Sequence, residues 1–196
     1  MKPSNQIQSI SSVRSSMIKR SGAILLSTFC LLGMTSCNKD DNEPIITTIS
    51  QQDRNFAISS SQFINAQLAF SQLAKEKGSD ALIVEYGEMI FVENTATKAE
   101  LTGILDTNKV EMSNVITTEM QAKYDELALL QGTAFDKAYI DYQVTELNNS
   151  ISMFENQVSN GQNFTIKGFA DKTLSAVKSN RNRALIIKTK VDIKNI

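Results

Sequence analysis

The chain has 196 residues, of which 41% are hydrophobic and 21% are charged, and its net charge is −1. This composition is typical of one globular domain with added segments, and it excludes a chain that is disordered throughout. The sequence contains no histidine, which excludes His-dependent catalytic triads and His metal sites. It also lacks a basic stripe with interleaved aromatic residues, so nucleic acid is not an expected partner.

Residues 1–36 are predicted to be a secretory signal peptide. Lys19 and Arg20 precede an apolar run over residues 23–34, which is shorter than the roughly 20 residues that a membrane-spanning helix needs. A basic segment, a short apolar segment and small residues in this order are typical of an export signal. Met17 begins a signal of ordinary length, so it is a candidate for the true start of the protein.

Cys37 is the predicted site of lipid attachment. The residues Met-Thr-Ser-Cys at 34–37 resemble a lipobox, although Leu is commoner than Met34 at its position. Cys30 leaves with the signal, so the mature chain keeps one cysteine and no disulfide. Several acyl chains on one residue, palmitate among them, give stable membrane anchoring. The alternative is a buried or disulfide-bonded cysteine, which the polar residues directly after Cys37 disfavour.

Residues 37–50 are predicted to be the lipidated N-terminus and an acidic linker. Within them, Lys39, Asp40 and Asp41 resemble the short Lys-plus-acidic signal that sends Bacteroidetes lipoproteins to the cell surface. A plain solvated linker is the alternative interpretation. Membrane contact through the lipid on Cys37 is expected in either case.

A helical domain is predicted over residues 51–190, followed by a tail at 191–196. Helices are expected over residues 51–77, 80–106, 118–131, 133–160 and 163–188, because apolar residues recur there at helical spacing between turn signals. Ser50 with Asp53 and Thr133 with Asp136 resemble capping boxes, and Ser79 is the expected N-cap of the second helix.

The inner faces of the long helices are read from their apolar stripes. In the first helix Phe56, Phe63 and Phe70 recur every seven residues. The cleanest stripe belongs to the fourth predicted helix, and its members are Ile140, Val144, Leu147, Ile151, Phe154 and Val158. Four such stripes favour an all-α fold, an antiparallel four-helix bundle with an extra short helix between the second and third long helices.

A faint internal repeat supports a pairing of the two halves of the bundle. Gly78, Ile83 and Tyr86 have the same spacing as a second set in the other half, which consists of Gly161, Ile166 and Phe169. Each set marks a turn and the first buried turn of the helix that follows.

Two segments resemble the signature of an exported bacterial family of ferritin-like domains, domain of unknown function 4142. Residues 133–141 look like its "AFD+AYL" segment, and residues 169–174 look like its "FAxKTLP" segment. The resemblance covers residues 53–187. It implies a ferritin-like bundle in an outer-membrane protein, and it implies no particular activity.

One departure from that family bears on metal binding. The resemblance places two common histidines of the family at Asn94 and Leu147, and neither residue is a good ligand for iron. No catalytic residue, cofactor or metal ligand is therefore assigned, and an enzyme is not expected. Glu93 and Asn94 are the only positions to watch for a metal.

The sequence thus predicts a lipid-anchored outer-membrane or cell-surface bundle that acts as a non-catalytic binding or structural module. The alternative is a metal-binding ferritin-like protein with a degenerate or carboxylate-only site. The ligand, the protein partner, the orientation and the oligomeric state stay open.

Overall fold

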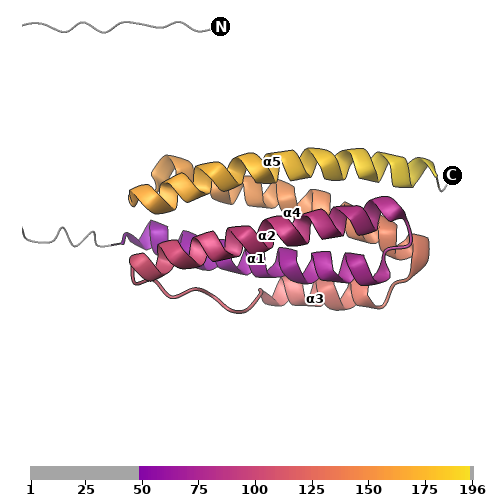
Figure 1. The fold of residues 1–196 in the computed structure, drawn as a ribbon, viewed down its shortest axis with the longest axis horizontal. Coiled ribbons are helices and arrows are strands. Elements are labelled where there is room, and N and C mark those ends of the chain that lie inside the picture. Colours follow the sequence, from indigo (N-terminus) through magenta and orange to yellow (C-terminus); the bar gives the residue numbers. More distant parts are fainter. Residues whose placement is uncertain (1–48, 195–196) are drawn as a thin grey trace, which may run out of the picture. The chain divides into compact units, whose positions relative to one another are not determined.

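The computed structural model describes residues 49–194, and helices are the only regular secondary structure in this part of the chain. The predicted signal peptide, Met17, Cys37 and the 39–41 signal lie outside the described residues. Figure 1 shows the five helices, which are α1 (Gln51–Lys77), α2 (Ala81–Thr107), α3 (Thr118–Ala128), α4 (Gly132–Asn160) and α5 (Phe164–Ile193). The expected helical bundle with a short third helix is confirmed.

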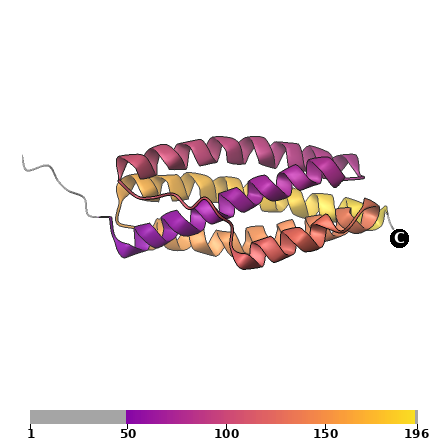
Figure 2. The same cartoon turned by 90° about the horizontal axis from the view of Figure 1, so that it is seen from below.

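The bundle consists of two helical hairpins, α1–α2 and α4–α5, which lie side by side (Figure 1). The short helix α3 packs beside α1 and α4, where the Tyr124 ring lies 5.8 Å from the Phe70 ring. The connection from α2 to α3 crosses the face of α1 (Figure 2). Asn65 of α1 holds it there by donating from Nδ2 to the Ser113 carbonyl at 2.8 Å. No helix within residues 49–194 is long and apolar enough to cross a membrane.

The first helix begins as predicted. The Ser50 hydroxyl accepts a hydrogen bond from the Asp53 amide at 3.1 Å and donates to the Asp53 carboxylate at 2.6 Å. These bonds satisfy one of the otherwise unpaired amides at a helix start. At α5, Asn163 caps in the same way by accepting from the amides of Thr165 and Ile166 at 3.1 Å.

The other two predicted caps are wrong. Helix α2 is capped by Asp80, whose carboxylate accepts from the Leu82 amide at 2.9 Å, and not by Ser79. Helix α4 begins at Gly132, and its N-cap Gln131 makes no side-chain capping bond. The carboxylate of Asp136 is used elsewhere. Two helix ends also differ, since α3 ends at Ala128 and α5 continues to Ile193.

Asp136 instead holds the loop of the other hairpin. Its carboxylate accepts from the amides of Ser79 and Asp80 at 3.0 and 2.9 Å, and also from the Ser79 hydroxyl. Because these amides lie at the start of α2, the Asp136 carboxylate also meets the positive end of that helix. The bond therefore ties the start of α4 to the turn between α1 and α2.

Asp53 makes the equivalent contact in the opposite direction. Its carboxylate accepts from the amides of Gln162 and Asn163 at 3.2 and 3.1 Å and from Gln157 Nε2 at 2.6 Å. Burial tends to raise the pKa of Asp53, but the hydrogen bonds from Ser50, Gln157 and the two amides outweigh it and lower that pKa. An aspartate of each hairpin thus accepts hydrogen bonds from the loop of the other hairpin. The two sets of the internal repeat begin at these two loops.

The core confirms the stripe of α1 and corrects that of α4. Phe56, Phe63 and Phe70 are all buried. In α4, the predicted stripe shares three members with the real inner face, namely Ile140, Leu147 and Phe154. The inner face of α4 is turned relative to the predicted one, so the three shared apolar residues alternate with buried polar residues. The buried polar residues are Gln143, Ser150 and Gln157. The apolar residues predicted in their place, which are Val144, Ile151 and Val158, are half-buried at the flank.

Candidate functional site

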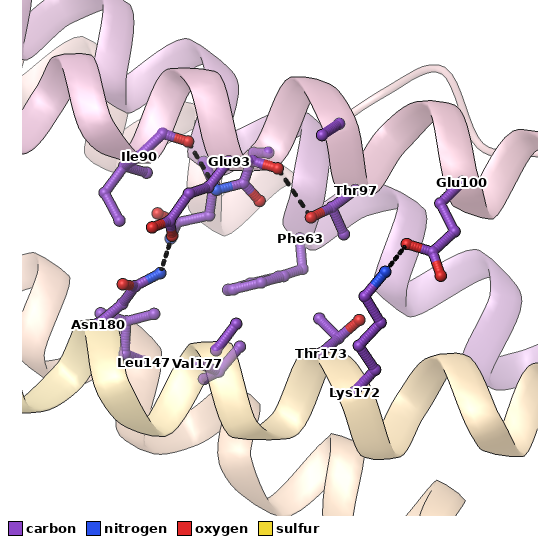
Figure 3. Close-up of a pocket in the computed structure, with 14 residues that line it drawn as sticks. Phe63, Ile90, Glu93, Thr97, Glu100, Leu147, Lys172, Thr173, Val177 and Asn180 are labelled. Atoms are coloured by element: carbon purple, nitrogen blue, oxygen red, sulfur yellow. Dashed lines mark hydrogen bonds and ion pairs between the residues drawn. The ribbon is translucent and has the colours of Figure 1, made fainter. Parts of the chain in front are cut away.

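A pocket of about 260 Å³ lies between α2 and α5 near the middle of the bundle (Figure 3). Its apolar walls come from all four long helices and consist of Phe63, Ile90, Leu147 and Val177. Two small residues also line the pocket, Ala96 of α2 and Ala176 of α5. Both alanines are exposed. We call this exposed side of the pocket its mouth.

The charged groups around the mouth are already paired. Lys172 of α5 forms an ion pair with Glu100 of α2 at 2.7 Å, which Figure 3 shows at one end of the pocket. At the other end, Asn180 Nδ2 donates to the Glu93 carboxylate at 2.7 Å, and Arg183 lies 3.7 Å from that carboxylate. Every charged side chain that lines the pocket therefore has a partner of its own.

The aromatic contacts show which residues of different helices lie at the same height along the bundle axis. The Phe56 ring lies 5.4 Å from the Phe154 ring and 6.4 Å from the Phe169 ring, so α1, α4 and α5 share one layer here. Three turns of an α-helix take about eleven residues. Moving three turns from this layer, forward on α1 and α5 and backward on α4, leads to one further layer. Its members are Gln67, Gln143 and Asn180.

Helix α2 adds a fourth residue to this layer. Gly87 lies so close to α1 that a Cβ there would be 2.9 Å from the Ala74 Cβ. Two turns, about seven residues, lead forward along α2 to Asn94 and backward along α1 to Gln67. The middle of the bundle therefore carries one carboxamide side chain from each long helix, and we call these four residues the amide layer: Gln67, Asn94, Gln143 and Asn180.

All four side chains of the amide layer are buried, but they differ in their hydrogen bonds. Gln67 and Gln143 are 1% and 0% exposed, and neither amide nitrogen nor amide oxygen of either residue has a hydrogen-bond partner in the described protein. Asn94 donates from Nδ2 to the Ile90 carbonyl of its own helix at 2.9 Å. A buried amide without partners costs about 1–3 kcal/mol, so the free amides of Gln67 and Gln143 need an explanation.

The pocket opens onto three members of this layer. Gln67, Asn94 and Asn180 line it, whereas Gln143 does not. Gln67, whose amide is buried and unpaired, therefore borders a space that a ligand can enter. This arrangement can bind a small molecule by offering it hydrogen bonds inside an apolar cavity.

The structure brings both watched positions, Glu93 and Asn94, to this pocket. Leu147 lies in the apolar wall, as expected from its stripe. Gln67, Gln143 and Asn180 were not predicted to be part of a site. In the sequence, each of these residues is a polar residue at a position where the helical spacing of the apolar stripe calls for an apolar one. A search for apolar residues alone does not detect such positions.

The described residues contain no group of three or more His, Cys, Asp or Glu side chains placed to hold a metal ion. Ser60 and Ser61 form hydrogen bonds to the Ala57 carbonyl of their own helix, at 3.3 and 2.6 Å. Tyr86 donates to the Asn180 carbonyl at 3.4 Å, and burial raises the pKa of its phenol. These three side chains are bonded to helix carbonyls, and none of them lines the pocket.

Comparison with known proteins agrees with this fold. The family model described as "Domain of unknown function (DUF4142)" matches residues 41–186. A crystal structure of a DUF305 fragment from Deinococcus radiodurans is similar in fold, with a TM-score of 0.62 and 10% sequence identity. The match covers 74% of this chain and 97% of that one. No curated protein matches.

Proposed function

This chain belongs to the family of domain of unknown function 4142, and we propose that it is a lipid-anchored, non-catalytic module that binds a small ligand in the pocket between α2 and α5. The observation that carries the binding role is the buried, unpaired amide of Gln67 at this pocket. Such an amide takes its hydrogen bonds from outside the protein, from an ordered water or from a ligand, and its place at the pocket favours a ligand.

The proposed location is the outer membrane, with the lipid on Cys37. The order of basic, apolar and small residues before Cys37 supports export and lipidation. Lys39, Asp40 and Asp41 support display on the cell surface. In this arrangement residues 38–50 are the tether, and α1 begins at Gln51.

A ferritin-like relationship is also proposed for the fold. It is supported by the order of the long helices and by polar side chains that meet at the middle of the bundle, where ferritin-like proteins carry their metal ligands. In this chain amides occupy that level, and amides are weak ligands for redox metals. A neutral ligand therefore fits the pocket better than a metal does.

The test fills the mouth of the pocket and leaves the buried residues that line it unchanged. The protein is the unlipidated mature chain, residues 37–196 with Cys37→Ser, and the probes are small neutral aromatic fragments observed by saturation-transfer NMR. Ala96→Leu places a larger side chain at the mouth. Ala99→Leu is the matched control, because Ala99 is also exposed on α2 but does not line the pocket.

We expect some fragments to bind the unlipidated mature chain and its Ala99→Leu variant, and to lose binding in the Ala96→Leu variant. Fragments that bind all three proteins equally would place their site elsewhere. The absence of any bound fragment would equally contradict the proposed function.

A further inference from the structure

We propose that the ligand of this pocket is an uncharged molecule that carries a primary or cyclic amide on an apolar body. This inference rests on the proposed function, because it names the chemistry that the same pocket would recognise. It follows from three properties of the pocket, which are the free hydrogen-bonding groups, the paired charges and the apolar walls.

Among the residues that line the pocket, Gln67 is the one whose amide atoms are both buried and without a hydrogen-bond partner in the described protein. Its amide offers N–H donors on the nitrogen and lone pairs on the oxygen, side by side in one plane. The structure leaves both atoms without partners. A second amide has the same two groups in the reverse order, so it can pair with Gln67 through two parallel hydrogen bonds once the Gln67 amide, which is buried in the free protein, turns toward the pocket. A ketone or an ester satisfies only the donor and leaves the Gln67 oxygen buried and unpaired.

The charges of the pocket favour an uncharged ligand. Lys172 is paired with Glu100, and Glu93 accepts from Asn180 and lies near Arg183. No counter-ion is therefore free for a carboxylate or an ammonium group that enters. Burying an ionised group without a counter-ion is strongly unfavourable.

The walls determine the rest of the molecule. Phe63, Ile90, Leu147 and Val177 offer carbon surface on the sides of the pocket. The volume of about 260 Å³ is slightly smaller than that of typical ligand pockets, which is about 300–1,000 Å³. A single ring or a short aliphatic body is of suitable size.

The experiment measures the affinity of three probes for the unlipidated mature chain by isothermal titration. Benzamide carries the amide, acetophenone lacks the N–H donors and benzoate carries a charge. We expect benzamide to bind about tenfold or more tightly than either of the other two, since one lost buried hydrogen bond corresponds to about this factor. Equal affinity of acetophenone and benzamide would overturn the amide inference and leave the pocket intact as a binding site.

Two variants locate the selectivity. Gln67→Leu should reduce the preference for benzamide over acetophenone about tenfold. Gln143→Leu is the matched control, because Gln143 is an unpaired amide of the same layer but does not line the pocket. It should keep the preference. An unchanged preference in Gln67→Leu, or equal losses in the two variants, would contradict recognition by Gln67, and circular dichroism checks that both variants are folded.

Discussion

Replacing Gln67 by Leu should make the bundle more stable while it removes the proposed ligand contact. The Gln67 side chain is 1% exposed and has no hydrogen-bond partner in the described protein. An unpaired buried amide costs about 1–3 kcal/mol. Leu has a similar volume and a similar helix propensity, so the exchange adds little strain. We expect the free energy of unfolding to rise by about 2 kcal/mol.

A domain of this size gains about 2–4 °C in melting temperature per kcal/mol, so the expected shift is roughly 4–8 °C. The assay is thermal unfolding of the unlipidated mature chain without ligand, followed by circular dichroism. Gln157→Leu is the matched control, because Gln157 is equally buried on α4 but its Nε2 donates to Asp53 at 2.6 Å. That variant should lose stability by about 1–3 kcal/mol.

The two Gln→Leu exchanges should therefore have opposite signs. If Gln67→Leu destabilises the protein as much as Gln157→Leu does, the Gln67 amide is satisfied in the free protein. The reasoning from its unpaired atoms to a ligand would then be refuted.

Further predictions concern lipid attachment at Cys37, sorting by residues 39–41, the hydrogen bonds of Asp53 and metal binding. Cys37→Ser should release the full-length protein from the membrane fraction or leave it unprocessed; normal processing with detergent-phase partitioning would contradict this. Alanine at positions 39–41 should keep lipidation but reduce cleavage by external protease on whole cells, and unchanged cleavage would leave a plain linker. The lowered pKa of Asp53 means that its bonds stabilise the fold above the pKa of the unfolded carboxyl and are lost as the pH falls through the folded pKa. Asp53→Asn should therefore be less stable than wild type at pH 7 by about 1–3 kcal/mol and show a smaller loss below about pH 5; unfolding curves with an identical pH dependence would contradict the assignment. A chelator should leave the melting temperature unchanged, whereas a clear drop would reveal a bound metal.

The sequence was sufficient to predict the helices, because apolar residues recur at helical spacing over long stretches. The capping box of Ser50 and Asp53 was also predictable, since both partners lie within one turn. Asp136 was assigned to a local cap because that motif depends only on neighbouring residues. Its real partners are Ser79 and Asp80 in the other hairpin, and only the packing of the two hairpins brings them together.

The amide layer illustrates a second limit. Ile140, Leu147 and Phe154 fit two alternative stripes, one completed by apolar residues and one completed by Gln143, Ser150 and Gln157. Hydrophobic periodicity chooses the first stripe, whereas the packed bundle uses the second. Burying a polar side chain on an inner face is unfavourable when one helix is considered alone, so periodicity does not predict it. The contacts that such a side chain makes depend on the three other helices. The sequence therefore indicated Glu93 and Asn94 as candidate site residues but did not indicate Gln67.

The central claim is that the pocket between α2 and α5 takes a ligand through the Gln67 amide. The most direct measurement is the side-chain N–H resonance of Gln67 in ¹⁵N-labelled unlipidated mature chain, assigned by its loss in Gln67→Leu, during titration with benzamide. We predict a saturable shift of this resonance, while the paired side chain of Gln157 stays unchanged. Saturation of benzamide binding with an unmoved Gln67 resonance would contradict the account.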